Sequence, residues 1–375
     1  MKIPRIYQNI GALLKPNKVL VIYGARQVGK TTMLQDYLKT CNLKYKLDSG
    51  DNHSTQNKLS SQDFTLLKEY AEGYELLAID EAQKIPNIGQ GLKILVDQIP
   101  GIKIIATGSS SFELSGQIGE PLTGRKVTLT LFPVSQLELR SLYNASELKE
   151  KLEESMIFGA YPEVVTETKK SQKARLLEEL VQSCLIKDIL ELERVKSSKT
   201  IMDLLRLVAF QVGSEVSLTE LSQHLGIDYK TVGRYLDLFE KSFIVYNLRG
   251  FSRNLRKEIT RKSKYYFLDN GIRNAVISNF NAMELRNDSG ALWENFILTE
   301  RLKKRAYQDI FSNAYFWRTW EQQEIDLVEE REGKLFAFEC KWGNRRVKPP
   351  SQWSVLYPGA SFEIIDKSNY LPFIA

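Results

Sequence analysis

The first 140 residues alternate short apolar runs with helix-forming segments. Strands that are buried on both faces of a parallel sheet have this continuous apolar character, because helices cover both of their faces. The segments predicted as strands are Val19–Tyr23, Tyr45–Asp48, Leu76–Glu81, Lys103–Ser110 and Lys126–Phe132. The pattern predicts an α/β domain over residues 1–140.

The middle of the chain shows helical spacing instead. Residues Glu147–Thr200 are charged, with apolar positions at helical intervals, and predict a helical lid or connector over residues 141–200. Further on, Ser217 and Glu220 form a capping box that opens a short helix, and Asp228 caps a second helix, Tyr229–Lys241. The inward-facing positions of the second helix are Val232, Tyr235, Leu236 and Phe239. This pair of helices predicts a helix-turn-helix.

Two apolar strands, Phe243–Leu248 and Tyr265–Leu268, enclose a basic stretch and complete the pattern of a winged helix over residues 201–272. Basic side chains on a recognition helix and a wing suit DNA phosphates and base edges. The candidates for this contact are Lys230, Arg234, Arg253, Arg256 and Lys257. A winged helix used for packing or protein contacts, with its charges solvated, is the alternative, because a fold alone does not fix function.

Residues 273–375 predict a small α/β domain. A helix carries Glu294, and two strands joined by a turn follow, the first with Asp326 and the second with Glu339 and Lys341. Side chains alternate across a strand, so pairing these strands as a hairpin brings the three together. Two carboxylates there could bind Mg²⁺, and the lysine could orient or activate a water for phosphodiester attack. A cluster of surface ion pairs is the alternative.

The segment Val19–Leu34 reads VLVIYGARQVGKTTML, which is a strand, a G-x-x-x-x-G-K-T loop and the start of a helix. Gly24 and Gly29 permit close approaches that a Cβ would block, so the N–H groups of the loop can surround an anion at the positive end of the helix. Lys30 would reach the β- and γ-phosphates, and the Thr31 hydroxyl would ligate Mg²⁺. A chance glycine turn is disfavoured, because strand and helix both fall where the motif requires them. The residues predicted to bind ATP are Gly24, Ala25, Arg26, Gln27, Val28, Gly29, Lys30, Thr31 and Thr32.

The polar ends of the next strands predict partners for this loop. Asp80 would hold the Mg²⁺, and Glu81 would orient the attacking water. An acidic helix start after a strand is the alternative for this pair. Thr107 or Ser109 could sense the γ-phosphate, or could belong to an ordinary turn with a helix cap.

Arg125 lies immediately before the fifth predicted strand. An arginine here could stabilise charge in the transition state, as arginine fingers do in other ATPases. If it acts in a neighbouring subunit, the protein is a homo-oligomer. A solvated arginine is the alternative.

Composition narrows the class of protein. A length of 375 residues suggests two or three domains, and 43% hydrophobic with 26% charged residues is ordinary for a globular protein. The net charge of +6 permits an acidic partner without requiring one. Three cysteines and two histidines argue against a disulfide framework, a zinc site or a histidine-based triad. The N-terminus lacks the apolar core of a signal peptide and no run approaches a membrane span, so we expect a cytoplasmic protein with no membrane partner.

Several motifs, in this order, resemble one family: GARQVGKTT, IDEAQ, TGSS, LTGR, LFPVS and FGAYP. It is the family of bacterial and archaeal AAA-type ATPases that carry a conserved, uncharacterised C-terminal region. The resemblance covers nearly the whole chain. It implies a sandwich of helices around a parallel sheet, a phosphate loop at Gly24–Thr31, a metal-binding and water-orienting pair at Asp80–Glu81, and a sensor near Thr107–Ser109. The Asp…Glu-x-Lys pattern with a preceding helical Glu resembles restriction-endonuclease-like nucleases, including archaeal Holliday-junction resolvases.

Taken together, the sequence predicts an α/β P-loop ATPase domain followed by a helical lid, a winged helix and a nuclease-like domain. ATP and Mg²⁺ are the expected cofactors, and DNA is the expected partner of an ATPase that couples nucleotide state to DNA engagement. The alternatives are a nucleotide-dependent switch that binds a protein partner and an ATP-regulated, Mg²⁺-dependent DNA nuclease.

Overall fold

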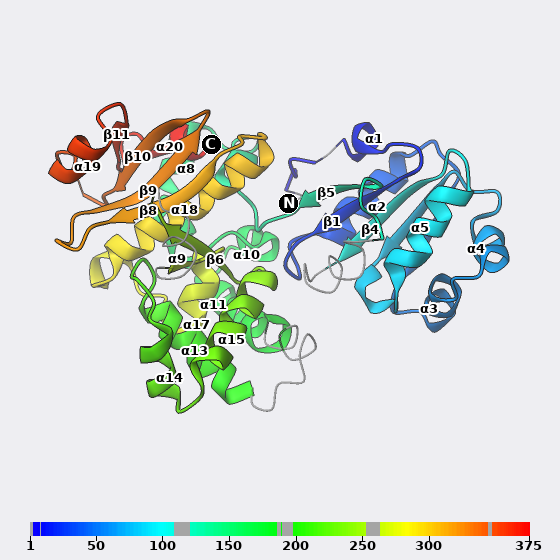
Figure 1. Cartoon of the computed structure of the whole chain (residues 1–375), viewed down its shortest axis with the longest axis horizontal. Coiled ribbons are helices and arrows are strands. Elements are labelled where there is room, and N and C mark those ends of the chain that lie inside the picture. The colour runs from blue at the N-terminus through cyan, green and yellow to red at the C-terminus, as the bar shows by residue number, and fades with distance from the viewer. Residues whose placement is uncertain are drawn as a thin grey trace.

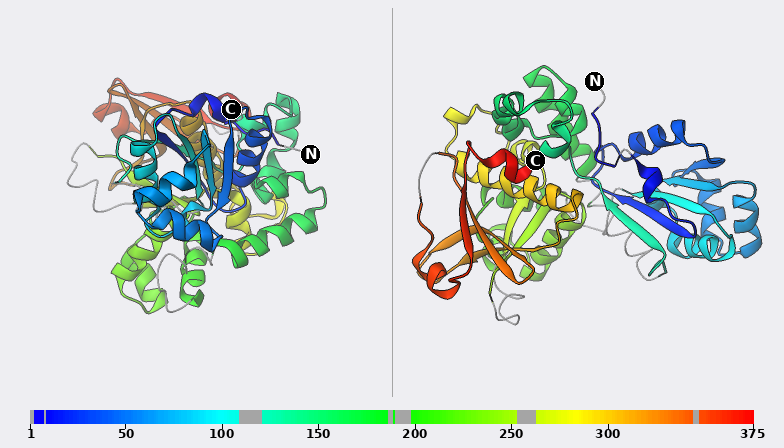
Figure 2. Two further views of the ribbon diagram at one scale, coloured as in Figure 1. Left: turned by 90° about the vertical axis from the view of Figure 1, so that its right-hand side faces the viewer. Right: turned by 90° about the horizontal axis from the view of Figure 1, so that it is seen from above.

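The computed structural model describes residues 3–7, 9–108, 121–185, 189, 198–252, 263–343 and 347–375. These residues form two bodies that lie side by side (Figure 1). The N-terminal body contains a five-stranded sheet, and the larger C-terminal body contains a six-stranded sheet and many helices. The first described residues, in dark blue, lie between the two bodies in both Figure 1 and the right-hand view of Figure 2.

The N-terminal sheet is parallel throughout, with strand order β2-β3-β4-β1-β5. Its strands are β1 (Lys18–Tyr23), β2 (Tyr45–Ser49), β3 (Leu76–Asp80), β4 (Lys103–Gly108) and β5 (Lys126–Thr130). Its helices are α1 (Ile10–Leu13), α2 (Lys30–Thr40), α3 (His53–Ser60), α4 (Phe64–Ala71), the 3₁₀ helix η1 (Ala82–Lys84) and α5 (Ile88–Gln98). Every strand predicted for this region is present, and helices cover both faces as expected for α/β.

Alternation along β1 explains why its apolar run is unbroken. Val19, Val21 and Tyr23 belong to one core together with residues of α3, α4 and α5. Leu20 and Ile22 belong to the other core, together with residues of α1 and α2. Because both faces of the strand are buried, neither can carry polar residues without cost.

The C-terminal sheet is mixed, with strand order β11-β10-β9-β8-β6-β7. Its strands are β6 (Val245–Gly250), β7 (Ser263–Phe267), β8 (Asn313–Arg318), β9 (Glu324–Arg331), β10 (Lys334–Cys340) and β11 (Ser361–Ile365). The helices up to the helix-turn-helix are α7 (Gln136–Leu139), α8 (Ala145–Glu150), α9 (Leu152–Phe158), α10 (Pro162–Thr166), α11 (Lys170–Glu179), the π-helix η2 (Leu180–Leu185) and α13 (Ser198–Phe210). The later ones are α14 (Leu218–Leu225), α15 (Tyr229–Lys241), α17 (Asn270–Val276), the 3₁₀ helix η3 (Met283–Leu285), α18 (Ser289–Tyr307), α19 (Ser351–Leu356) and α20 (Tyr370–Ile374).

Helices α14 and α15 form the predicted pair. Gly226 ends α14 in the left-handed region at φ 64°, which glycine adopts without strain. Asp228 caps α15 by accepting a hydrogen bond from the N–H of Lys230, and α15 has the bounds that the sequence predicts. The four apolar positions predicted to face inward on α15 are all buried.

The two strands after α15 belong to a larger sheet than the sequence predicts. β6 and β7 pair antiparallel, but β6 also pairs parallel with β8, where Arg249 lies opposite Tyr315. The six-stranded sheet therefore crosses the predicted boundary between residues 272 and 273, which lies within α17. The boundary at residue 200 lies within α13. In the described ranges, no helix combines the length and the apolar character needed to cross a membrane.

Candidate active site

The phosphate loop lies at the carboxyl end of β1. A Cβ on Gly24 would stand 2.1 Å from the carbonyl oxygen of Leu131, so the loop packs too closely against the end of β5 for any other residue. Gly29 has φ 95°, the left-handed region, and α2 begins at the next residue. The glycines of the motif are therefore required by close packing and by backbone conformation.

The Lys30 side chain is buried and folds back onto its own loop. Its Nζ donates hydrogen bonds to the carbonyl oxygens of Gly24 at 2.8 Å and Ala25 at 2.6 Å. The ammonium group is thus held inside the loop, where the predicted phosphates would lie. An anion that entered the loop would compete with these two carbonyl groups for the ammonium.

Asp80, the last residue of β3, is the centre of a polar cluster that also contains Thr107 on β4 and Thr31 at the start of α2. The Thr31 hydroxyl donates to Asp80 Oδ2 at 2.8 Å, and the Thr107 hydroxyl donates to Asp80 Oδ1. The backbone N–H of Glu81 donates to the Thr107 hydroxyl at 3.3 Å. Carboxylate and hydroxyl oxygens are the ligands that Mg²⁺ prefers, so Thr31 and Asp80 suit that ion. The structure brings these predicted residues together.

Glu81 leaves the strand in a strained conformation. Its φ is 51°, in the left-handed region that non-glycine residues rarely adopt, and its Oε2 accepts a hydrogen bond from the Gln83 side chain at 2.7 Å. A Cβ on Gly50 would stand 2.2 Å from the Glu81 carbonyl oxygen, so β2 and β3 leave no room there. Strain of this kind persists where the surroundings fix it, and it commonly marks a functional position.

A cavity of about 670 Å³ lies beside the loop and was not predicted from the sequence. The first described residues, α2 and α10 all contribute to its walls. Among the lining residues are Ile3, Pro4, Arg5, Met33, Tyr37 and Pro162. Its volume and its mainly apolar walls are those of a pocket for a small organic molecule. Since the walls come from segments far apart in the chain, no local pattern could have indicated them.

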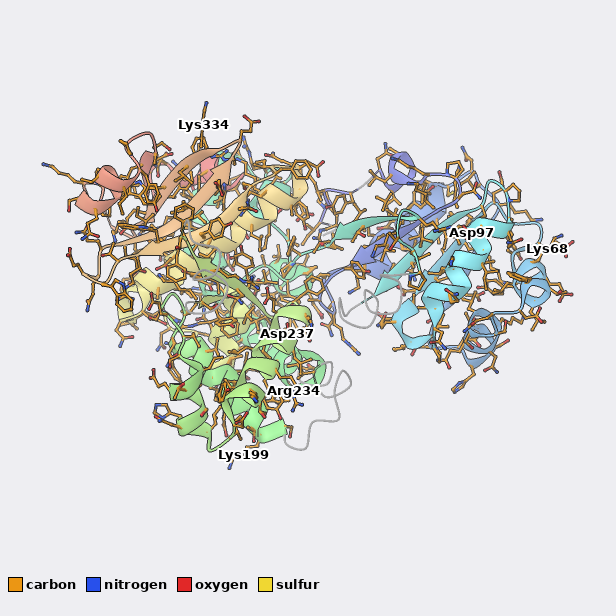
Figure 3. All side chains as sticks on the ribbon, viewed as in Figure 1. Lys68, Asp97, Lys199, Arg234, Asp237 and Lys334 are labelled. Carbon is orange, nitrogen blue, oxygen red and sulfur yellow. The ribbon has the colours of Figure 1, made fainter. Side chains whose placement is uncertain are left out.

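Arg125 lies far from the loop. Its carbonyl accepts a hydrogen bond from the Val19 N–H, which places it at the beginning of β1, whereas the loop follows the end of that strand. Five residues of β5 separate the two, about 16 Å at the usual rise per residue. The Arg125 Nε instead donates to the Asp97 carboxylate on α5 at 2.6 Å (Asp97 is labelled in Figure 3). The structure therefore does not bring Arg125 to the phosphate site of its own chain, and action in a neighbouring subunit stays a prediction.

The carboxylates of the C-terminal body do come together, as the hairpin prediction required. β9 and β10 pair antiparallel, and the N–H of Cys340 donates to Asp326 Oδ2 at 2.7 Å. Burial, and after it the carboxylates of Glu294 and Glu339, raise the pKa of Asp326 well above its ordinary value. Burial also raises the pKa of Glu294. The Lys264 ammonium and the Tyr266 hydroxyl, which donates to Glu294 at 2.6 Å, act in the opposite direction and lower it.

Lys264, at the end of the basic stretch between the two predicted strands, lies inside this cluster. Lys264 on β7 is 1% exposed, and its Nζ forms an ion pair with Glu324 and lies 3.6 Å from Glu294. Burial alone would lower its pKa, but Glu294, Glu324 and Asp326 together raise it. Lys341 pairs with Glu339 at 2.6 Å and is one-third exposed.

These contacts bear on the predicted second Mg²⁺ site at Asp326 and Glu339. Throughout the described ranges, no three histidine, cysteine, aspartate or glutamate side chains are arranged to hold a metal ion. The Lys264 ammonium faces Glu324 and Glu294, whereas Glu339 pairs with Lys341 through Oε1 and its Oε2 is buried with no hydrogen-bond partner among the described residues. The absence of such a group of three does not bear on a site built on two carboxylates, so a Mg²⁺ ion at Asp326 and Glu339 and the phosphodiester chemistry expected from it stay predictions.

The candidate DNA-binding residues divide into two groups. Lys230 and Arg234 lie exposed on α15 with Tyr229, which is 50% exposed; Figure 3 labels Arg234. Arg253, Arg256 and Lys257 lie outside the described residues, as does Ser109 of the predicted sensor. Asp237, also labelled in Figure 3, and Glu240 place negative charge on the same helix.

Comparison with known families agrees with the N-terminal geometry. Residues 16–140 match the model of an AAA domain, residues 149–283 match a domain of unknown function, and residues 289–357 match a second such domain. The parallel sheet, the phosphate loop and this match together support an AAA-type P-loop ATPase with two uncharacterised C-terminal domains.

Relatives resemble the chain over most of its length. An uncharacterized protein of Mycobacterium tuberculosis is 28% identical over 329 residues, which cover 86% of this chain and 70% of the relative. An uncharacterized protein of Haemophilus influenzae is 25% identical over 358 residues, covering 86% of this chain and 82% of the relative. One of Methanocaldococcus jannaschii is 25% identical over 357 residues, covering 89% and 77%. The likeness therefore extends through both bodies.

Proposed function

We propose that this chain binds ATP with Mg²⁺ in its N-terminal body and hydrolyses it. The observation that carries the proposal is the cluster in which Asp80 accepts hydrogen bonds from Thr31 and Thr107, next to a phosphate loop that already contains an ammonium group. Thr31 and Asp80 would hold the metal ion. When bound, Mg²⁺ would neutralise the charge on the β- and γ-phosphates.

The remaining roles follow from position. Lys30 would exchange its two loop carbonyls for the phosphate oxygens. Glu81, adjacent to the Mg²⁺ carboxylate and held in a fixed backbone conformation, would orient the attacking water. Thr107 bridges Asp80 and the Glu81 N–H, so it would link the metal site to the water site. The cavity beside the loop would take the base and ribose, because it begins at Gly29 and Thr32.

The same protein would couple its nucleotide state to DNA engagement through α15. Support comes from the two-helix geometry and from the exposed Tyr229, Lys230 and Arg234 near the start of that helix. In a helix-turn-helix, these are the positions that meet the major groove. A basic and aromatic surface also suits the phosphate backbone.

A nucleotide-dependent switch that binds a protein is the second candidate. Asp237 and Glu240 are exposed on the same helix, and Asp237 forms an ion pair with Lys241 at 2.5 Å. On a surface of mixed charge, the acidic side chains repel phosphates while the basic side chains attract them. It suits a protein surface at least as well as a DNA surface.

The test is the ATPase rate of the purified chain, measured with no nucleic acid, with single-stranded DNA, with duplex DNA and with RNA. We expect Mg²⁺-dependent hydrolysis that DNA stimulates. A Lys230→Ser, Arg234→Ser double variant should lose the stimulation and the salt-dependent binding, while Lys334→Ser, an exposed lysine on β10, should keep both. Hydrolysis without any DNA effect, together with a partner that survives nuclease treatment of a lysate, would favour the protein switch. Absence of ATP binding would remove the whole proposal.

A further inference from the structure

Arg5 connects the phosphate loop to the beginning of the C-terminal body. Its guanidinium donates to the carbonyl oxygen of Val28 in the loop, and to that of Phe132 at 2.7 Å. Its Nε donates to Glu138 Oε1 at 2.8 Å. The Arg5 side chain is 9% exposed and that of Glu138 is 1% exposed. A single buried cation therefore joins three segments of the chain.

The far side of this contact is helix α18. The Tyr307 hydroxyl, at the end of α18, accepts a hydrogen bond from the Phe132 N–H at 3.0 Å and lies 3.5 Å from the Arg5 guanidinium. Glu300 on the same helix accepts a hydrogen bond from the Gln136 N–H at 2.6 Å. The chain from β5 to α7 is thus bonded to α18 on one side and to Arg5 on the other. We call Arg5, Glu138 and Tyr307 the Arg5 junction.

The contact with Val28 constrains the next peptide group. In a planar trans peptide the N–H points opposite to the C=O. Because Arg5 holds the Val28 carbonyl, the N–H of Gly29 must point to the other side of that peptide plane. In a phosphate loop the N–H groups must face the anion, and a carbonyl that turned inward would repel it. Arg5 therefore acts on the group that a phosphate would contact.

We propose that Arg5 is a positioning residue of the nucleotide site, which holds the loop in its anion-binding conformation and passes changes in that conformation to α18. The proposal rests on ATP binding at the loop. When phosphates draw Lys30 away from the Gly24 and Ala25 carbonyls, the loop readjusts. This movement reaches Arg5, because Arg5 is bonded both to the loop and to the residues that contact α18. Nucleotide binding then alters the hydrogen bonds from Phe132 and Gln136 to α18.

The test compares variants of the full chain for binding of a non-hydrolysable, fluorescent ATP analogue with Mg²⁺, and for hydrogen exchange of the Phe132 and Gln136 amides. Arg5→Lys keeps the positive charge for Glu138 but cannot form the guanidinium's several directed bonds at once. It should weaken analogue binding by about tenfold, the usual effect of losing one hydrogen bond to a charged group. It should also remove the analogue-dependent change in exchange.

Tyr307→Phe supplies the second variant, because its side chain belongs to the other body. It should weaken binding less than Arg5→Lys does and still remove the analogue-dependent change at Phe132. Lys304→Met, on the same helix but bonded to Pro372 and Ala375, should behave as the wild type. If Arg5→Lys binds the analogue as tightly as the wild type and keeps the exchange response, the inference is wrong. If the wild-type chain binds no analogue, ATP binding itself fails, which is a different result.

Discussion

In the N-terminal body Asp80 accepts hydrogen bonds from the neutral hydroxyls of Thr31 and Thr107, whereas in the C-terminal body Glu324 and Glu294 face the buried ammonium of Lys264. Both sites gather carboxylates at a sheet. A carboxylate with hydroxyl partners keeps its full negative charge available to a cation from solution. Glu294 and Glu324 already face an internal ammonium, so a metal ion bound to these two carboxylates would have to compete with the lysine.

The two clusters therefore differ in what faces their carboxylates. Three acidic side chains in a nuclease-like order can face a cation of the chain itself, so their order alone does not establish a metal site. The position of Lys264 is therefore the informative observation in the second body.

The largest effect is expected at the phosphate loop. Lys30→Ala removes the ammonium that would bind the β- and γ-phosphates, and should reduce the ATPase rate by roughly a hundredfold or more, as removal of a charge-stabilising donor does in other enzymes. The rate is measured under saturating Mg²⁺ and ATP. Lys39→Ala, at the exposed end of the same helix, is the matched control and should hydrolyse ATP normally. Equal rates in both variants would show that the loop is not the catalytic site.

Next comes Lys264→Met, which removes the internal cation from beside the largely buried Glu294 and the partly exposed Glu324. Breaking a buried ion pair in this way costs about 3 kcal/mol or more of unfolding free energy. Chemical denaturation followed by tryptophan fluorescence measures it. Lys341→Met should cost much less, because that lysine is one-third exposed.

The same variant can overturn the contrast. If Lys264→Met recovers its stability on addition of Mg²⁺, while the wild type does not respond, the cluster is a latent metal site. No response to Mg²⁺ in either protein supports the structural interpretation.

For Asp326 we expect a smaller effect, which is a dependence of the unfolding free energy on pH with a specific sign. Its pKa is higher in the folded than in the unfolded chain, so between the two values the folded state binds more protons. The unfolding free energy therefore falls as pH rises through that interval. Asp326→Asn does not titrate and can still accept the bond from Cys340, so it should flatten this dependence of the unfolding free energy on pH.

The control for that measurement has the opposite sign. Hydrogen bonds from Ser368 hold the pKa of Asp366 below its ordinary value. The ionised Asp366 carboxylate adds stability above its unfolded pKa, and this stability is lost as the pH falls through its folded pKa. Asp366→Asn should therefore reduce the fall in unfolding free energy at acid pH. A profile for Asp326→Asn that matches the wild type would contradict the burial argument.

The parts of the fold that the sequence predicted are those with local causes. Helix α15 has the predicted bounds because its cap, its apolar spacing and the glycine before it all lie within a few residues. The strands of the N-terminal sheet followed from apolar runs for the same reason. The cluster at Asp80 was predictable because each of its members ends a parallel strand or begins a helix, and such ends meet at one edge.

What failed depended on pairing between distant segments. Lys264 ends a stretch that is basic by its neighbours in sequence, but it is buried on β7 with its ammonium beside Glu294 of α18 and Glu324 of β9. The partners of Arg5 are between 23 and 302 residues away, so no local pattern could identify it. Arg125 is different, since the direction of β5 already implied its place. In a parallel sheet, the residue that precedes one strand and the residues that follow the neighbouring strand lie at opposite edges of the sheet.

The smallest effect is therefore expected for Arg125→Ala in a dilute, monomeric sample. The side chain forms a half-exposed ion pair with Asp97, of a kind worth less than about 1 kcal/mol, and it is remote from the phosphates of its own chain. The ATPase rate per molecule should match the wild type when it is measured at low protein concentration. If the wild-type rate rises with concentration and the Arg125→Ala rate does not, the arginine acts on the phosphates of a neighbouring subunit. A loss of rate in the variant at every concentration, in a protein shown by light scattering to be a monomer, would contradict the position of Arg125 at the far edge of the sheet.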